Sequence, residues 1–266
     1  MNLYDLLSLD IWGFTPASWA IFALAVFIVG FSKTGLPGIT IIAVPLAAMV
    51  LPPKISVGVL LPIYMCADIA SVVTYFRSAN LRYCFPYLIF VAVGVFAAGQ
   101  VVERMTDANF GALIGWTVFA LLTFNFVSDW LLFKRAGRNS DDLPPVPKPP
   151  LRESALFGFL IGLFSALANA AGPISSLYLV RARLPKYEFL GTSAVCAFIL
   201  NWFKIPLFIS RGMITPDTLK LCVAALPVIV IGGAMGVLVA KRIPQKSFKT
   251  IVLVLAYLAS IKLILG

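Results

Sequence analysis

The sequence predicts an all-α integral membrane protein made of two inverted repeats, each a broken or re-entrant helix pair followed by three transmembrane helices. Three observations predict this class. The 266 residues are 61% hydrophobic and 12% charged, whereas soluble domains are about 45–50% apolar and about 25% charged. A polar, proline-rich segment divides the chain into two apolar halves of similar size. Each half begins with an apolar run that glycine and proline interrupt.

The composition excludes several classes of function. The chain has no histidine, which excludes zinc–histidine chemistry, a Ser-His-Asp triad and a histidine proton relay. The sequence contains no phosphate-binding loop, nucleophile elbow or dinucleotide fingerprint. We therefore expect neither an enzyme nor a cofactor or metal centre. We assign the net charge of +10 to cytoplasmic loops of a membrane protein, and not to nucleic-acid binding.

Three segments organise the chain. Residues 1–133 form the first membrane repeat, 134–152 a cytoplasmic proline-rich linker, and 153–266 the second membrane repeat. The apolar segments of the two repeats are 17–36, 37–50, 55–76, 84–102 and 108–133, then 153–168, 171–182, 189–209, 218–240 and 247–265. The last three of each set approach the roughly 20 residues that a transmembrane helix needs.

The first two segments of each set are separated only by a helix break. The breaks are Gly35-Leu-Pro-Gly38 and Ala170-Ala-Gly-Pro173. The run from Ala17 to Met49 would extend about 50 Å as one helix, too long for a single crossing. We expect two short helices at each break, either as a re-entrant hairpin or as a pair of short spans.

The two halves also resemble each other in sequence. One register places Gly58 on Gly191 and Asp68 on Asn201. Weak internal symmetry around interrupted apolar segments is typical of secondary transporters.

The distribution of basic residues predicts the orientation. With the linker in the cytoplasm and each broken pair returning to the side that it entered from, fourteen of the 21 Lys and Arg residues are cytoplasmic and five lie outside. This bias follows the positive-inside rule. Both termini are then outside, each half crosses an odd number of times, and the repeats have opposite orientations.

Lys33 is the strongest candidate for a binding residue. It lies at the first break, where Ser32, Thr34, Gly35 and Gly38 surround it. A charge at membrane depth costs about 3 kcal/mol, so it normally faces a cavity or a partner. Restarting helices present N–H groups that attract anions. The alternative is a lysine that extends to the interface or pairs structurally.

The second break supplies neutral groups for the same site. Asn169, Gly172, Pro173, Ser175, Ser176 and Tyr178 lie at or just after it. Pro173 suits the first turn of a restarting helix. The hydroxyls can instead bond their own backbone, as serine in membrane helices often does.

Three further polar residues are candidates for coupling. Asp68 lies inside an apolar segment, its repeat equivalent is Asn201, and Lys204 follows Asn201 by one helical turn. Asp68 could carry a proton or counter-ion, and the alternative is a structural salt bridge to a membrane lysine. The four cysteines, Cys66, Cys84, Cys196 and Cys222, form no CxxC pair. We interpret them as small buried hydrophobic residues and expect no disulfide framework.

At the two breaks the chain resembles the sulfite exporter TauE/SafE family. The resemblance rests on Gly30-Phe-Ser-Lys-Thr-Gly-Leu-Pro-Gly38 and Ala168-Asn-Ala-Ala-Gly-Pro173, and it covers two homologous halves and a polar linker. It implies a multi-pass plasma-membrane transporter for sulfite, sulfonates or related sulfur-containing anions.

Together these observations predict a secondary transporter of a small sulfur-containing anion, coupled to protons or another ion. Its partners are the anion and the bilayer, and the sequence leaves open whether the protein forms an oligomer. Two alternatives remain, a passive anion channel and a structural subunit of a membrane complex.

Overall fold

A computed structural model describes residues 13–34, 39–135, 150–181, 184, 186–239, 261 and 264–265, and every regular element in these ranges is helical. The helices of the first half are α2 (Pro16–Thr34), η2 (Ile39–Ile42), α3 (Ala43–Ala48), α4 (Pro53–Tyr75), η3 (Phe76–Ser78), η4 (Leu81–Tyr83), α5 (Phe85–Arg104) and α6 (Asp107–Arg135). Those of the second half are α7 (Leu151–Ala168), α8 (Gly172–Arg181), α9 (Lys186–Ser210) and α10 (Pro216–Val239).

Seven of the helices in the described ranges are long and apolar enough to cross a membrane, namely α2, α4, α5, α6, α7, α9 and α10. The long segments expected at 55–76, 84–102, 108–133, 189–209 and 218–240 thus correspond to helices. The segment expected at 247–265 lies almost entirely outside the described residues, as does most of the expected linker.

The expectation of two short helices at each break is wrong for the first helix of each pair. Helices α2 and α7 have 19 and 18 residues, enough to cross the hydrocarbon core of a bilayer at about 1.5 Å per residue. Only the second helices are short, with six residues in α3 and ten in α8. The break therefore separates a full-length helix from a short one, because the residues before each break already suffice for a complete crossing.

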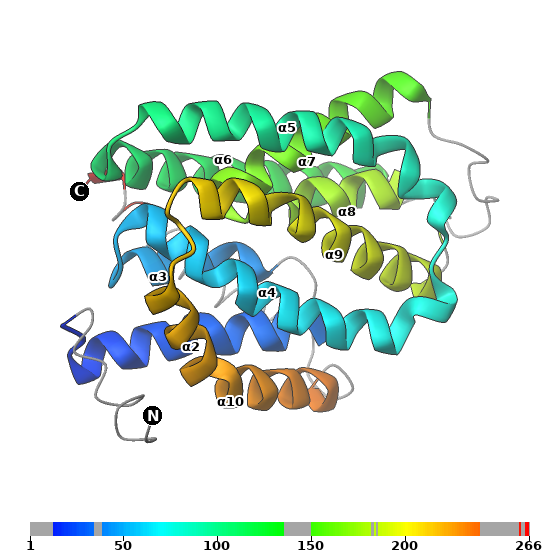
Figure 1. Cartoon of the computed structure of the whole chain (residues 1–266). Coiled ribbons are helices and arrows are strands. Elements are labelled where there is room, and N and C mark those ends of the chain that lie inside the picture. Colours follow the sequence, from blue (N-terminus) through cyan, green and yellow to red (C-terminus); the bar gives the residue numbers. More distant parts are fainter. Residues whose placement is uncertain are drawn as a thin grey trace.

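The helices form three layers in which the two halves of the chain interlock. In Figure 1, α5 and α7 lie at the top, α2 and α10 at the bottom, and α4 and α9 between them. The main packing partners are α5 with α7, α2 with α10, and α4 with α9. Each outer layer thus joins the first helix of one half to a later helix of the other half.

Glycines allow the outer pairs to approach closely. A Cβ atom on Gly162 of α7 would overlap the Val91 carbonyl of α5, and one on Gly94 of α5 would overlap the Phe159 carbonyl of α7. In the α2/α10 layer, a Cβ on Gly30 would lie 2.5 Å from the Ile229 carbonyl oxygen. Gly158 and Gly162 of α7 have GxxxG spacing and both lie against the α5 backbone, a form of close helix packing that is common in membranes.

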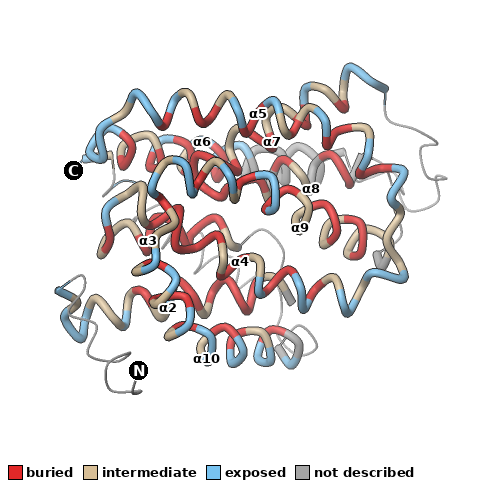
Figure 2. Tube along the Cα trace, viewed as in Figure 1, coloured by how far each residue is buried: buried red, intermediate tan, exposed pale blue. Residues whose placement is uncertain are grey.

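The burial pattern indicates that the outer faces of the helices are in contact with lipid. Figure 2 shows buried residues along the inward sides of the helices and exposed residues on the outward sides. Large apolar side chains are among those exposed, including Val73, Ile89, Phe96 and Trp116. Exposed apolar patches on this scale indicate contact with a membrane.

Candidate functional site

A single residue with a left-handed backbone conformation forms the second break. Asn169 follows α7 with φ +48°, and asparagine is one of the few residues that adopts this region at low cost. Its amide N–H bonds to the Ser165 carbonyl at 2.9 Å, and that of Ala170 bonds to the Phe164 carbonyl at 3.2 Å. These bonds close the C-terminus of α7. The chain then restarts at Gly172, with Pro173 at the second position of α8, as the sequence predicts.

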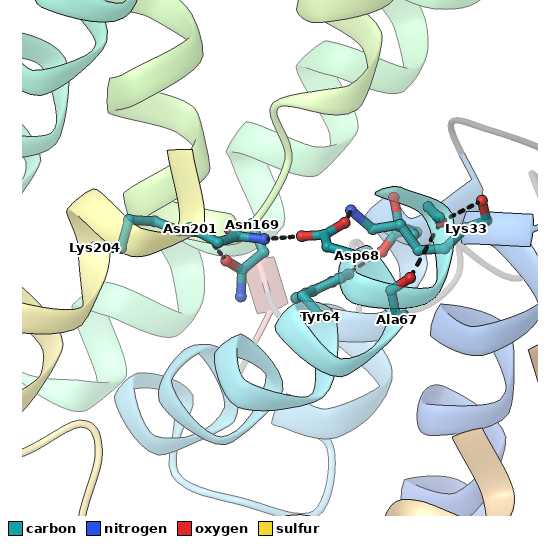
Figure 3. Close-up of polar contacts among 9 residues, drawn as sticks. Lys33, Tyr64, Ala67, Asp68, Asn169, Asn201 and Lys204 are labelled. Atoms are coloured by element: carbon teal, nitrogen blue, oxygen red, sulfur yellow. Dashed lines mark hydrogen bonds and ion pairs between the residues drawn. The ribbon is translucent and has the colours of Figure 1, made fainter. Parts of the chain in front are cut away.

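A row of polar contacts crosses the centre of the molecule from α2 to α9. The ammonium group of Lys33, at the end of α2, pairs with Asp68 Oδ1 on α4. The Asn201 side chain on α9 donates to Asp68 Oδ2 at 2.5 Å. Asp68 is fully buried, and Figure 3 shows it between Lys33 and Asn201. Asp68 and Asn201, which one register aligns between the two halves of the sequence, therefore contact each other directly.

Lys204 lies at the α9 end of this row and has a different environment. It is 1% exposed, and its ammonium group donates to Asn169 Oδ1 at 2.6 Å and to the Ser165 carbonyl at 3.4 Å. The ammonium also lies 5.7 Å from the centroid of the Phe208 ring. Within the described part of the chain, no carboxylate forms an ion pair with Lys204. Its partners are neutral oxygens and an aromatic face.

A cavity of about 120 Å³ lies along this row. By the same measure one water molecule needs about 10–15 Å³, so the space is large enough for a small oxyanion. The ends of both broken pairs reach it, through Ser32 and Lys33 on one side and Ala171, Gly172 and Ser175 on the other. The first turn of α8 therefore borders the cavity, where the positive end of a helix dipole favours anions.

The cavity brings together eight of the fourteen residues that the sequence singles out. These are Ser32, Lys33, Asp68, Asn169, Gly172, Ser175, Asn201 and Lys204. Gly35 and Gly38 lie outside the described residues, and the side chains of Thr34, Pro173 and Ser176 are also outside them. Tyr178 is not in the lining: its hydroxyl donates to the Tyr83 carbonyl at 3.3 Å, in a buried aromatic cluster with Tyr87 and Phe157.

Several polar residues that line the cavity are not among the candidates that the sequence singles out, although helical periodicity around Asp68 and Asn169 could have indicated them. Tyr64 and Ser71 lie four residues before and three after Asp68, so they share its face of α4. The Tyr64 hydroxyl donates to the Thr40 carbonyl at 3.0 Å, and the Ser71 hydroxyl donates to the Lys33 carbonyl at 3.1 Å. Both bonds anchor the first broken pair to α4. Ser165 similarly precedes Asn169 by one turn and lines the cavity.

The cavity has an unbalanced charge. The charged side chains in its described lining are Lys33, Lys204 and Asp68. Lys33 and Asp68 neutralise each other as an ion pair, so that Lys204, in its protonated form, is a positive charge without a carboxylate partner among the described lining residues. A buried charge without a counter-charge is strongly unfavourable. The arrangement is suited to a ligand that carries one net negative charge.

Comparison with protein families identifies the chain. The family model described as sulfite exporter TauE/SafE matches residues 22–263. The chain belongs to the sulfite exporter TauE/SafE family. Proteins of this family are membrane transporters and not enzymes. Searches of curated proteins and of solved structures gave no significant match.

The match to the TauE/SafE model extends across both halves of the chain and so includes both helix breaks. The resemblance that the break motifs indicate is therefore confirmed. It identifies the chain as a multi-pass membrane protein of a family that exports sulfite and related sulfur-containing anions.

Two of the cysteines require a correction. Cys84 and Cys196 form a disulfide that joins the start of α5 to α9, with their Cα atoms 5.7 Å apart. The expectation that the chain has no disulfide is therefore wrong. The two residues are separated by 112 positions in sequence, so no local spacing pattern reveals the pair. Cys66 and Cys222 are free, and Cys222 is buried as expected whereas Cys66 is exposed.

Proposed function

We propose that this protein is a secondary carrier that moves a small sulfur-containing monoanion, such as bisulfite or a sulfonate, across the plasma membrane through the central cavity. The observation that carries the proposal is the charge balance of the cavity, in which two lysines oppose one aspartate. Family membership supports a sulfur-containing anion as the cargo.

The buried ammonium of Lys204 supplies the driving force for binding. Removing one partner of a buried ion pair costs about 3–5 kcal/mol, and Lys204 resembles such a half-pair when the cavity holds no anion. A bound oxyanion supplies the missing negative charge. Its oxygens can accept further hydrogen bonds from the N–H groups at the start of α8 and from the Ser175 hydroxyl, which border the same cavity. Neutral donors of this kind hold an anion without trapping it.

The Lys33–Asp68 pair supports proton coupling. Asp68 neutralises Lys33 and accepts a hydrogen bond from Asn201. Protonation of Asp68 would release Lys33 and raise the net charge of the cavity from one to two positive charges. The anion then binds more tightly to the protonated state, and by linkage the bound anion favours protonation. Proton and anion would therefore move in the same direction.

Inverted repeats fit the packing of the helices. If the halves are repeats, α2 corresponds to α7 and α5 corresponds to α10. Exchanging the halves then converts the α2/α10 contact into the α7/α5 contact, and both contacts form main packing layers. The direct contact between Asp68 and Asn201 is expected for equivalent residues near a two-fold axis. With the positive-inside orientation, the linker at 134–152 is cytoplasmic and both termini are outside.

Counterflow of labelled anion in proteoliposomes tests the proposed function. Proteoliposomes that hold the carrier with its Cys84–Cys196 disulfide reduced, and that are loaded with unlabelled sulfonate, should accumulate labelled sulfonate transiently, with a flux that saturates. We expect Lys33→Ala to abolish this exchange, whereas Lys220→Ala should retain it because Lys220 lies on α10 outside the cavity and pairs with Asp217.

The same measurement separates the alternatives. Linear flux without trans-stimulation would identify a passive channel, which could use the same basic cavity. The absence of any anion-dependent flux from correctly folded protein would favour a structural subunit and would contradict the proposal.

A further inference from the structure

The connector between α4 and α5 is clamped to the first half of α9. The Asn80 amide N–H donates to Thr192 Oγ1 at 2.9 Å, and the Asn80 side chain donates to Glu188 Oε2 at 3.3 Å. A Cβ atom on Gly191 would lie 2.5 Å from the Tyr75 carbonyl oxygen, so the two backbones are in close contact. We call this contact, between residues 75–84 and 188–196, the connector clamp.

The disulfide closes the connector clamp covalently. Cys84 is the last residue of the connector, and Cys196 lies on α9 one turn beyond Thr192. The clamp joins the first half of the chain to the second half. A carrier must move these two halves relative to each other to open its cavity on either side. The hydrogen bonds of the clamp can break during such a movement, whereas the disulfide cannot.

The two sulfur atoms differ in their access to the cavity. Cys196 belongs to the cavity lining, beside Ala197 and Leu200 on the same helix, whereas Cys84 does not. Both cysteines are buried from the outer surface. A small nucleophile inside the cavity therefore meets Cys196 before it meets Cys84.

We propose that the Cys84–Cys196 disulfide is a reaction site for sulfite and locks the connector clamp until sulfite in the cavity opens it. The inference rests on the proposed function because sulfite must enter the cavity. The lone pair on the sulfite sulfur attacks Cys196 Sγ and forms a new S–S bond. The Cys84–Cys196 bond breaks, and its electron pair leaves with Cys84 as a thiolate. Cys196 becomes an S-sulfonate, and no external oxidant or reductant is needed.

The reaction is reversible and selective for one type of cargo. The Cys84 thiolate can attack Cys196 Sγ, expel sulfite and form the disulfide again, by the same mechanism as thiol–disulfide exchange. A sulfonate or sulfate has no lone pair on its sulfur and cannot react. Among the anions that enter the cavity, only sulfite therefore opens the lock. Unreactive anions can occupy the cavity, but the disulfide then stays intact.

Mass spectrometry of the purified protein under non-reducing conditions tests the reaction. Cys66→Ser and Cys222→Ser remove the two free thiols, so that only Cys84 and Cys196 are measured. We expect sulfite to add one SO₃ group at Cys196 and to release one thiol at Cys84. Isethionate and sulfate should produce neither change, and excess isethionate should slow the reaction with sulfite by competing for the cavity.

Three results would overturn the proposal. They are two free thiols before any treatment, an SO₃ group on Cys84 instead of Cys196, and a disulfide that a thiol reductant opens but sulfite does not.

Transport of isethionate in the same background tests the lock separately from the proposed function. Exchange should be lost in the oxidised protein and restored by sulfite or by a thiol reductant. Cys84→Ser should exchange isethionate without either treatment. Equal exchange by the oxidised and reduced proteins would refute the lock while leaving the carrier intact. Absence of exchange in Cys84→Ser, with the protein folded, would instead count against the proposed function.

Discussion

Replacing Lys204 with methionine removes the charge on which the binding argument depends. Methionine keeps much of the length and apolar volume of the lysine stem. The exchange removes the ammonium group that donates to Asn169 and Ser165. At an effective dielectric near 20, two unit charges about 4 Å apart interact by about 4 kcal/mol. Since about 1.4 kcal/mol corresponds to a tenfold change in affinity, we expect the anion to bind roughly a thousandfold more weakly.

A thermal-shift titration in detergent measures this loss. At a ligand concentration of 100 times Kd, binding stabilises the wild-type protein by about 2.7 kcal/mol. A thousandfold weaker Kd reduces the stabilisation at the same concentration to about 0.1 kcal/mol or less, so the shift in Tm should disappear. The titration uses isethionate, which cannot react with the disulfide.

Two further variants keep the result interpretable. Lys220→Met removes a lysine that lies outside the cavity and pairs with Asp217, and it should retain the full shift. Lys204→Arg keeps the positive charge and should retain binding to within about tenfold, although arginine is not equivalent to lysine in shape. A Lys204→Met protein whose shift matches that of the wild type would refute the charge argument.

Three other predictions concern the cavity and its supports. Asp68→Asn should tighten anion binding and remove the pH dependence of exchange in proteoliposomes, and an unchanged pH profile would exclude Asp68 as the proton carrier. Gly162→Ala should lower the free energy of unfolding by about 1–3 kcal/mol because the added Cβ meets the Val91 carbonyl. Gly99→Ala should lower it less because the added Cβ meets only a flexible leucine side chain. Equal losses of Tm in the two variants would contradict this. Asn169→Ala should lower the free energy of unfolding by about 1–2 kcal/mol more than Asn169→Gly does, because both variants lose the contact with Lys204 but only alanine is strained at φ +48°. Equal Tm values for the two variants in a melting experiment would contradict this.

The positions of the helix breaks could be predicted from the sequence because local chemistry determines them. Glycine and proline disrupt helices wherever they occur in an apolar run, and Asn169 adopts the left-handed conformation that the break needs. The depth of Lys33 and Asp68 in apolar segments also indicated that each needs a partner. The salt-bridge alternative for Asp68 is the contact that forms, between residues 35 positions apart.

Other features depend on packing between the halves, which a single sequence does not encode locally. Cys84 and Cys196 are brought together by the contact of the connector with α9, and nothing in their spacing distinguishes them from Cys66 and Cys222. Tyr178 lies only a few residues after the second break, yet its helical position directs it to Tyr83 and away from the cavity. Proximity in sequence to a break is therefore a weaker guide to the lining than the helical face.

Locating a bound sulfonate in the structure tests the central claim most directly. Crystals of the protein with bromomethanesulfonate would reveal the bromine atom by its anomalous scattering. We expect the sulfonate oxygens within hydrogen-bond distance of Lys204 Nζ, in the cavity between Lys33 and the first turn of α8. A sulfonate bound elsewhere, with the central cavity occupied by water alone at saturating concentration, would contradict the account.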